Sequence, residues 1–165
     1  MFELFLENRA TVQKLLVVLL FAGAWWRGGG PERACGAVLA GMIVVQLALR
    51  DFTGLESNYM WLDPVMFSID CLGLAGFVAI ALRANRFYPL VLAATQLVAF
   101  MAHLVRVLVE PVSSLAYYLL IAMPFWFQII VLAVGLGRHA LRRSHHGYYP
   151  DWRPLASPQQ RPSVS

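Results

Sequence analysis

The residues that could do chemistry gather in one apolar segment, FYPLVLAATQLVAFMAHLVRVLVE at positions 87–110. Their spacings of seven, three and four residues place them on a single face of a helix. They are Gln96, His103, Arg106 and Glu110. A charged side chain at the centre of a bilayer costs roughly 2.5–3.5 kcal/mol on insertion scales. We therefore expect this face to turn away from lipid and into a helix bundle, where ionisable residues mark ion, proton or ligand sites.

A further acid, Asp70, lies in the apolar segment that precedes this one. The connection at residues 83–86 is so short that the two segments must be antiparallel neighbours. Asp70 lies six residues after Pro64, and His103 lies seven residues before Glu110, so each is about 9–10 Å deep at ~1.5 Å per residue. We predict that Asp70 pairs with His103, with Arg106 or with both.

The intramembrane cluster is the name we give to these residues with Gln46, which we expect at similar depth on the segment before them. Its full membership is Gln46, Asp70, Gln96, His103, Arg106 and Glu110. Interhelical polar contacts in membranes commonly serve packing, so the favoured interpretation is a structural pair. The alternatives are an outward-facing pocket for a proton, an ion or a small head group, and an acid–base pair of Asp70 and His103.

The spacing of the other reactive residues predicts no cofactor, no metal and no catalytic residue. Cys35 and Cys71 form no CxxC pair, and no histidine stands at zinc-ligand spacing from them. A bis-histidine haem needs two histidines at one depth, whereas His103 belongs to one half of the bundle and the other histidines to the opposite end. Those are His139, His145 and His146.

The composition indicates an all-α, polytopic membrane helix bundle. The chain has 165 residues, a hydrophobic content of 59% and a mean hydropathy of +0.63, well above the values of ordinary soluble domains. We predict five transmembrane helices, at about 10–26, 33–49, 64–82, 87–109 and 112–137. Residues 1–143 would form the bundle and residues 144–165 a largely disordered tail. Pro124 predicts either a kinked fifth helix or two short segments that meet there.

The distribution of basic residues predicts the orientation. Nine of the 13 arginines and lysines fall on the side of the C-terminal tail, which the positive-inside rule places in the cytoplasm. The N-terminus would then lie outside. The near absence of lysine beside many arginines is typical of GC-rich bacteria, so we expect a bacterial inner membrane. Because topology explains the basic residues, we expect the bilayer as a partner and no nucleic acid.

The sequence contains no catalytic motif and no long loop that could build a site outside the bundle. We therefore expect a non-enzymatic accessory or structural subunit that contacts another membrane protein or a second copy of itself. The alternative is a small oligomeric transporter or channel in which Asp70, His103 and Arg106 line the outer half of the route.

Overall fold

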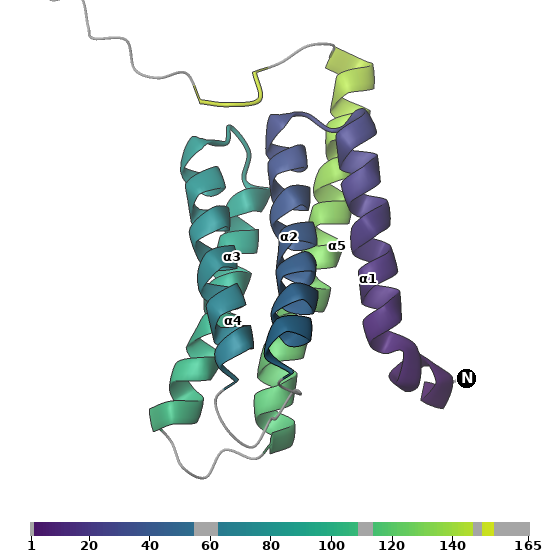
Figure 1. Cartoon of the computed structure of the whole chain (residues 1–165). Helices are drawn as coiled ribbons and strands as arrows, with labels where there is room; N and C mark the ends of the chain where they lie inside the picture. The colour runs from purple at the N-terminus through teal and green to yellow at the C-terminus, as the bar shows by residue number, and fades with distance from the viewer. Residues whose placement is uncertain (1, 55–62, 109–113, 147–149, 154–165) are drawn as a thin grey trace, which may run out of the picture.

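The structure, a computed structural model, describes residues 2–54, 63–108, 114–146 and 150–153, and its helices form one elongated bundle (Figure 1). The helices are α1 (Phe2–Arg27), α2 (Gly30–Thr53), α3 (Pro64–Arg83), α4 (Tyr88–Leu108) and α5 (Ser114–His146). The prediction of an all-helical bundle is confirmed. We call the end that carries residues 28–29, 84–87 and 150–153 the Arg86 end, and the opposite end the Arg9 end.

Local capping explains where the central helices begin. The Asp63 carboxylate accepts hydrogen bonds from the backbone N–H groups of Val65 and Met66, at 3.0 and 3.2 Å, which satisfies the first turn of α3. At the start of α2, the Glu32 carboxylate accepts from the N–H of Gly29 at 3.1 Å. The other end of α2 is closed by Gly54 in the left-handed conformation, with φ 62°.

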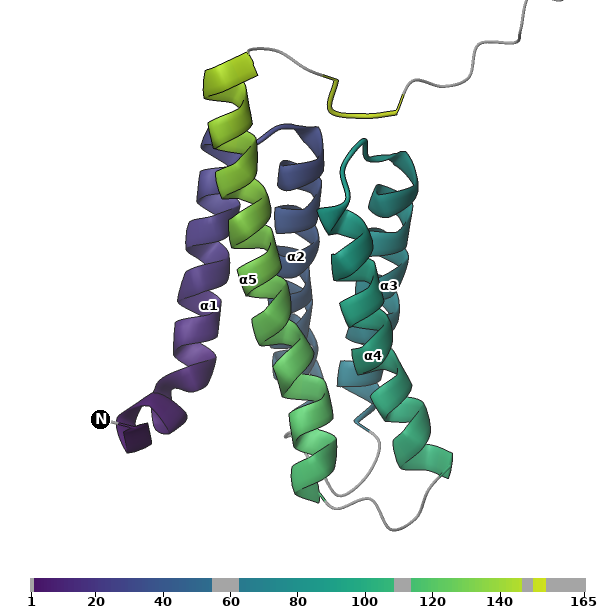
Figure 2. The ribbon, with the colours of Figure 1, turned by 180° about the vertical axis from the view of Figure 1, so that it is seen from behind.

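Each helix packs against the next in the chain, and α5 returns to contact α1, α2 and α4. Viewed from behind, α5 crosses in front of α2, with α1 on one side and α4 on the other (Figure 2). Helices α3 and α4 are neighbours, as their short connection predicts. Four completely buried core residues lie in the half of the bundle towards the Arg86 end. They are Leu39, Phe77, Leu92 and Leu132.

Four of the described helical segments are long and apolar enough to cross a membrane: Gly30–Thr53, Pro64–Arg83, Tyr88–Leu108 and Ala116–His145. These segments indicate a multi-pass membrane protein. Helix α1 is not among them, and its apolar run from Leu15 to Trp26 is preceded by Arg9, Gln13 and Lys14.

Helix α5 takes the single-helix form of the two expected for the fifth span, but its end differs from the expected one. It runs as one helix through Pro124, so the chain does not break into two segments there. It also continues to His146 instead of ending near residue 137, which places residues 144–146 of the expected tail within a helix. Part of the remaining tail is ordered as well. The backbone of Asp151 and Arg153 exchanges hydrogen bonds with Asn85 and Arg83. Residues 154–165 lie outside the described part of the chain.

The small residues of the central helices differ in what they face. A Cβ atom at Gly73 of α3 would lie 2.8 Å from the Sδ atom of Met42 and 3.4 Å from Cδ of Gln96, so α2 and α4 both approach closely here. Gly36 of α2 faces Phe21 and Ala24 of α1 in ordinary contact. Gly41 has open space around its Cβ position.

We predict that Gly73→Leu lowers the stability of the bundle by about 1–3 kcal/mol, because the added side chain overpacks the α2–α3–α4 contact. Gly41→Leu is the matched control, since it adds the same side chain where nothing lies within 4 Å. Thermal unfolding of both variants in the same detergent measures the difference. Equal melting temperatures would contradict the close approach at Gly73.

Candidate functional site

The centre of the candidate site is the buried carboxylate of Asp70 on α3. Its Oδ2 atom lies 2.8 Å from Nε2 of His103 on α4, and the imidazole is completely buried. The Nδ1 atom of His103 lies 2.8 Å from the hydroxyl of Tyr117 on α5. A neutral His103 that donates from Nε2 to Asp70 therefore accepts the hydroxyl hydrogen of Tyr117 at Nδ1. Three helices are joined by this acid–imidazole–phenol chain.

Two amides extend the chain deeper into the bundle. The side-chain amide of Gln96 donates to Oδ1 of Asp70 at 2.8 Å and to the backbone carbonyl of Asp70 at 3.3 Å. Its oxygen accepts from Nε2 of Gln128 at 2.6 Å. The Oε1 atom of Gln128 is buried and has no hydrogen-bond partner among the described residues. The series Tyr117–His103–Asp70–Gln96–Gln128 thus ends in an acceptor that lacks a donor, which a buried amide rarely tolerates.

The other predicted members of the cluster lie at different distances from this centre. Arg106 is half-buried, and its guanidinium carbon lies 5.3 Å from the centroid of the Tyr117 ring. The structure thus pairs Asp70 with His103 and places Arg106 one step further out, against the phenol. Gln46 of α2 lines the cavity described below. Glu110 lies outside the described residues.

A cavity of about 240 Å³ lies against the amide end of this chain. Its polar lining residues come from all five helices: Arg9, Gln13, Lys14, Gln46, Asp70, Gln96, Tyr118 and Gln128. The cations of α1 lie at the Arg9 end, where the guanidinium carbon of Arg9 is 4.4 Å from the centroid of the Tyr118 ring. Gln128 lies 14 residues after the start of α5, about 21 Å along the helix at ~1.5 Å per residue.

The cavity stops at the completely buried core residues of the Arg86 half. Leu92 lies one turn beyond Gln96 on α4, and Leu132 lies one turn beyond Gln128 on α5. Leu39 of α2 and Phe77 of α3 belong to the same core. The arrangement is therefore a dead-end polar pocket, which we call the five-helix pocket.

A second polar cluster, which the sequence analysis missed, closes the Arg86 end. Arg86 forms ion pairs with Glu32, which is completely buried, and with Asp151, and its Nη1 atom lies 2.9 Å from Nδ1 of His139. Asp151 also accepts from the backbone N–H of Gly30 at 2.9 Å. A signal for this cluster existed in the sequence, because Glu32 and Asp151 are acids on the side that carries nine arginines.

The chemistry of the described residues is that of binding and proton sharing. No group of three His, Cys, Asp or Glu side chains in the described part of the chain could hold a metal ion. Cys35 and Cys71 are free thiols. The Asp70–His103–Tyr117 chain can store or relay a proton, and the five-helix pocket offers an unused acceptor at Gln128 to a donor group.

Comparison with known proteins yields no relative: no family model matches the chain, and neither the curated proteins nor the solved structures give a match. Function must therefore be argued from the geometry of this chain alone.

The hydrogen-bond chain predicts opposite outcomes for two substitutions of Asp70. In Asp70→Asn, the new amide can accept from His103 and donate to Gln96 if both glutamine amides turn over, a reversal that loses only the 3.3 Å bond from Gln96 to the backbone carbonyl of residue 70. We expect a loss of at most about 1 kcal/mol. Asp70→Leu removes both acceptors, and each stranded buried donor costs roughly 1–3 kcal/mol.

Thermal unfolding of the purified variants distinguishes these outcomes. Asp70→Leu should unfold at a clearly lower temperature than Asp70→Asn, and Tyr117→Phe should lie between them because it strands only Nδ1 of His103. An Asp70→Asn protein as unstable as Asp70→Leu would show that the charge of Asp70, rather than its hydrogen bonds, holds the helices together.

Proposed function

We propose that this protein is a non-enzymatic, five-span membrane protein that binds a small polar ligand in the five-helix pocket and serves as an accessory or binding subunit. The observation that carries the proposal is a polar pocket, between helices of membrane-spanning length, that ends at a buried acceptor with no donor among the described residues. A ligand with a hydrogen-bond donor satisfies Gln128. Its anionic end, where it has one, meets Arg9 and Lys14.

The surface of α1 supports a fifth span. The helix lies alongside α2 and α5 for most of the length of the bundle (Figure 1). Its outward side chains at Leu15, Val18 and Leu19 are all more than half exposed. An apolar outward face beside four spans is suited to contact with lipid, because outside a bilayer these apolar side chains would be exposed to water. Trp25 and Trp26 then stand at the interface.

The orientation follows from the excess of arginines at the Arg86 end. Positive-inside places this end in the cytoplasm and the N-terminus outside. The five-helix pocket then belongs to the outer half of the protein. An arginine-rich, lysine-poor chain of this kind fits the inner membrane of a bacterium.

Two roles are compatible with an outer pocket. In the first, which we favour, the protein binds its ligand for another membrane protein or for a second copy of itself, and the closed core beyond Gln128 supports this role because it leaves no route through the bundle. The second is a small oligomeric transporter or channel. The intramembrane acid Asp70 favours this role, since such residues mark pathways, but the core of the Arg86 half would have to open.

Cysteine labelling tests the topology. In a Cys35→Ala, Cys71→Ala background, we expect Ala10→Cys to react with a membrane-impermeant thiol reagent in intact cells. Gly137→Cys should react only after permeabilisation, because it belongs to the cytoplasmic end. Both positions are exposed, so differences in burial do not explain the contrast. Equal labelling of the two positions in intact cells would exclude a crossing by α1 with this orientation.

Filling the pocket tests the binding role. Ala122→Phe places an aromatic ring in the five-helix pocket, whereas Ala133→Phe places the same ring on an exposed position of the same helix. We expect native mass spectrometry of gently extracted protein to detect a small bound molecule in the wild type and in Ala133→Phe, and none in Ala122→Phe.

The same mass spectra identify protein chains that co-purify with the protein. Vesicles reconstituted with the purified protein measure flux across the membrane. A defined partner with no flux supports the accessory role. Flux through the wild type that is lost in Ala122→Phe would replace it with the transporter role. No bound molecule in any of the three proteins would contradict ligand binding altogether.

A further inference from the structure

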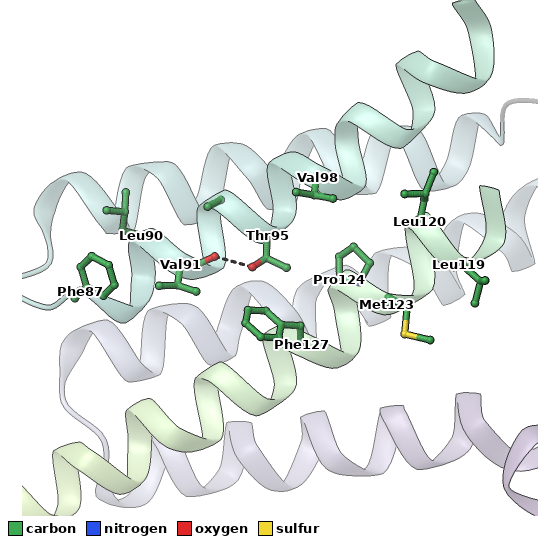
Figure 3. Close-up of a pocket in the computed structure, with 11 residues that line it drawn as sticks. Phe87, Leu90, Val91, Thr95, Val98, Leu119, Leu120, Met123, Pro124 and Phe127 are labelled. Atoms are coloured by element: carbon green, nitrogen blue, oxygen red, sulfur yellow. Dashed lines mark hydrogen bonds between the residues drawn. The ribbon is translucent and has the colours of Figure 1, made fainter. Parts of the chain in front are cut away.

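An apolar groove lies between α4 and α5 on the membrane-facing surface of the bundle (Figure 3). Its volume is about 750 Å³, and Phe127 and Pro124 of α5 face Val91 and Thr95 of α4 across it, with Leu120 further along, towards Val98. The hydroxyl of Thr95 donates to the backbone carbonyl of Val91 at 2.8 Å, so its hydrogen is not available to a polar ligand. The groove therefore suits a hydrocarbon chain.

This groove continues into a second hollow, of about 410 Å³, at the Arg86 end. The two share Phe87 and Val91, and the wall on α5 continues from Phe127 through Ile130 and Val134. Here the lining becomes basic, because Arg138 and Arg142 follow at one-turn intervals on the same face of α5. Both arginines are exposed. The combined feature, which we call the α4–α5 groove, has an apolar length and one cationic end.

The acid that lines the cationic end is already neutralised. Glu32 is completely buried and forms an ion pair with Arg86. The exposed basic residues that line the hollow are Arg138 and Arg142. Juxtamembrane arginines of this kind attract anionic lipid head groups.

We propose that the α4–α5 groove binds one anionic diacyl phospholipid from the leaflet at the Arg86 end. Arg138 and Arg142 contact the phosphate and the anionic head group, and an acyl chain lies along Val134, Ile130 and Phe127. The distance from Arg138 to Phe127 is 11 residues of helix, about 16 Å at ~1.5 Å per residue. Half of a ~30 Å hydrocarbon core has the same length.

The charge at one end favours lipid over a partner helix. A transmembrane helix would follow the whole groove, and two cations at one end would add no specific contact to it. A phospholipid has one anionic end, and its acyl chains stop near the bilayer centre. This site is independent of the five-helix pocket, because the two share no lining residue.

Native mass spectrometry of the full chain in detergent, titrated with dioleoyl phosphatidylglycerol or dioleoyl phosphatidylcholine, tests the proposal. We expect the wild type to retain one phosphatidylglycerol more strongly than phosphatidylcholine. The double variant Arg138→Gln, Arg142→Gln should bind phosphatidylglycerol roughly 30-fold more weakly, since each basic residue at an anionic surface contributes a factor of roughly five. The control Arg27→Gln, Arg143→Gln removes two exposed arginines that do not line the groove.

A steric variant tests the apolar length separately. Val134→Trp adds bulk at an exposed position of the wall and should weaken the retention of both lipids, with the melting temperature of the protein unchanged. Three results would each overturn the proposal. They are equal losses in the two double variants, equal retention of the two lipids by the wild type, and cross-linking that finds a second copy of the chain in the groove.

Discussion

The buried carboxylate of Asp70 constrains how α3, α4 and α5 are arranged. An acid that is buried to this extent must find most of its donors within the bundle, because an uncompensated charge there costs several kcal/mol. Gln96 and His103 supply them from α4, seven residues apart and therefore on one face. Their own remaining groups then require Gln128 and Tyr117 from α5. One acid thus fixes the register of three helices, and the small Gly73 lets them come close enough to meet.

Sequence reasoning could anticipate the part of this network that depends on loop length. The short 83–86 connection fixes the register of α3 against α4, so counting residues from each end brings Asp70 and His103 to one depth. The connection between α4 and α5, residues 109–113, is nearly as short, so the same count applies to α5. Tyr117 and Gln128 were missed because an uncharged tyrosine or glutamine in an apolar segment does not by itself indicate a buried polar contact. For Arg106, the other partner predicted for Asp70, sequence reasoning did not anticipate the contact of its guanidinium with the Tyr117 ring.

The polar cluster at the Arg86 end was missed for a related reason. Counting arginines assigns a side of the membrane, but it treats every charge at that side as solvated. Glu32 is instead completely buried, and it draws Arg86 inward; Arg86 in turn holds Asp151 of the C-terminal segment. The contact joins residues that are 65 positions apart, so neither periodicity nor a local motif records it. Removing one member of such a pair costs more than the pair contributes, since it leaves a buried charge behind.

Helix α5 divides the molecule between its two environments. Its inward face carries Tyr117, Gln128 and Leu132, so polar groups give way to the apolar core along a single helix. Its outward face carries Phe127 and Val134 and becomes basic only at Arg138. Tyr117 and Gln128 thus belong to the Arg9 half, and the outward basic residues lie at the Arg86 end, where buried His139 contacts Arg86. The separation allows a continuous helix through Pro124 to serve a polar pocket on one side and the bilayer on the other. A ligand in the pocket and a lipid in the groove can then affect each other only by moving helices that line both, such as α4 and α5.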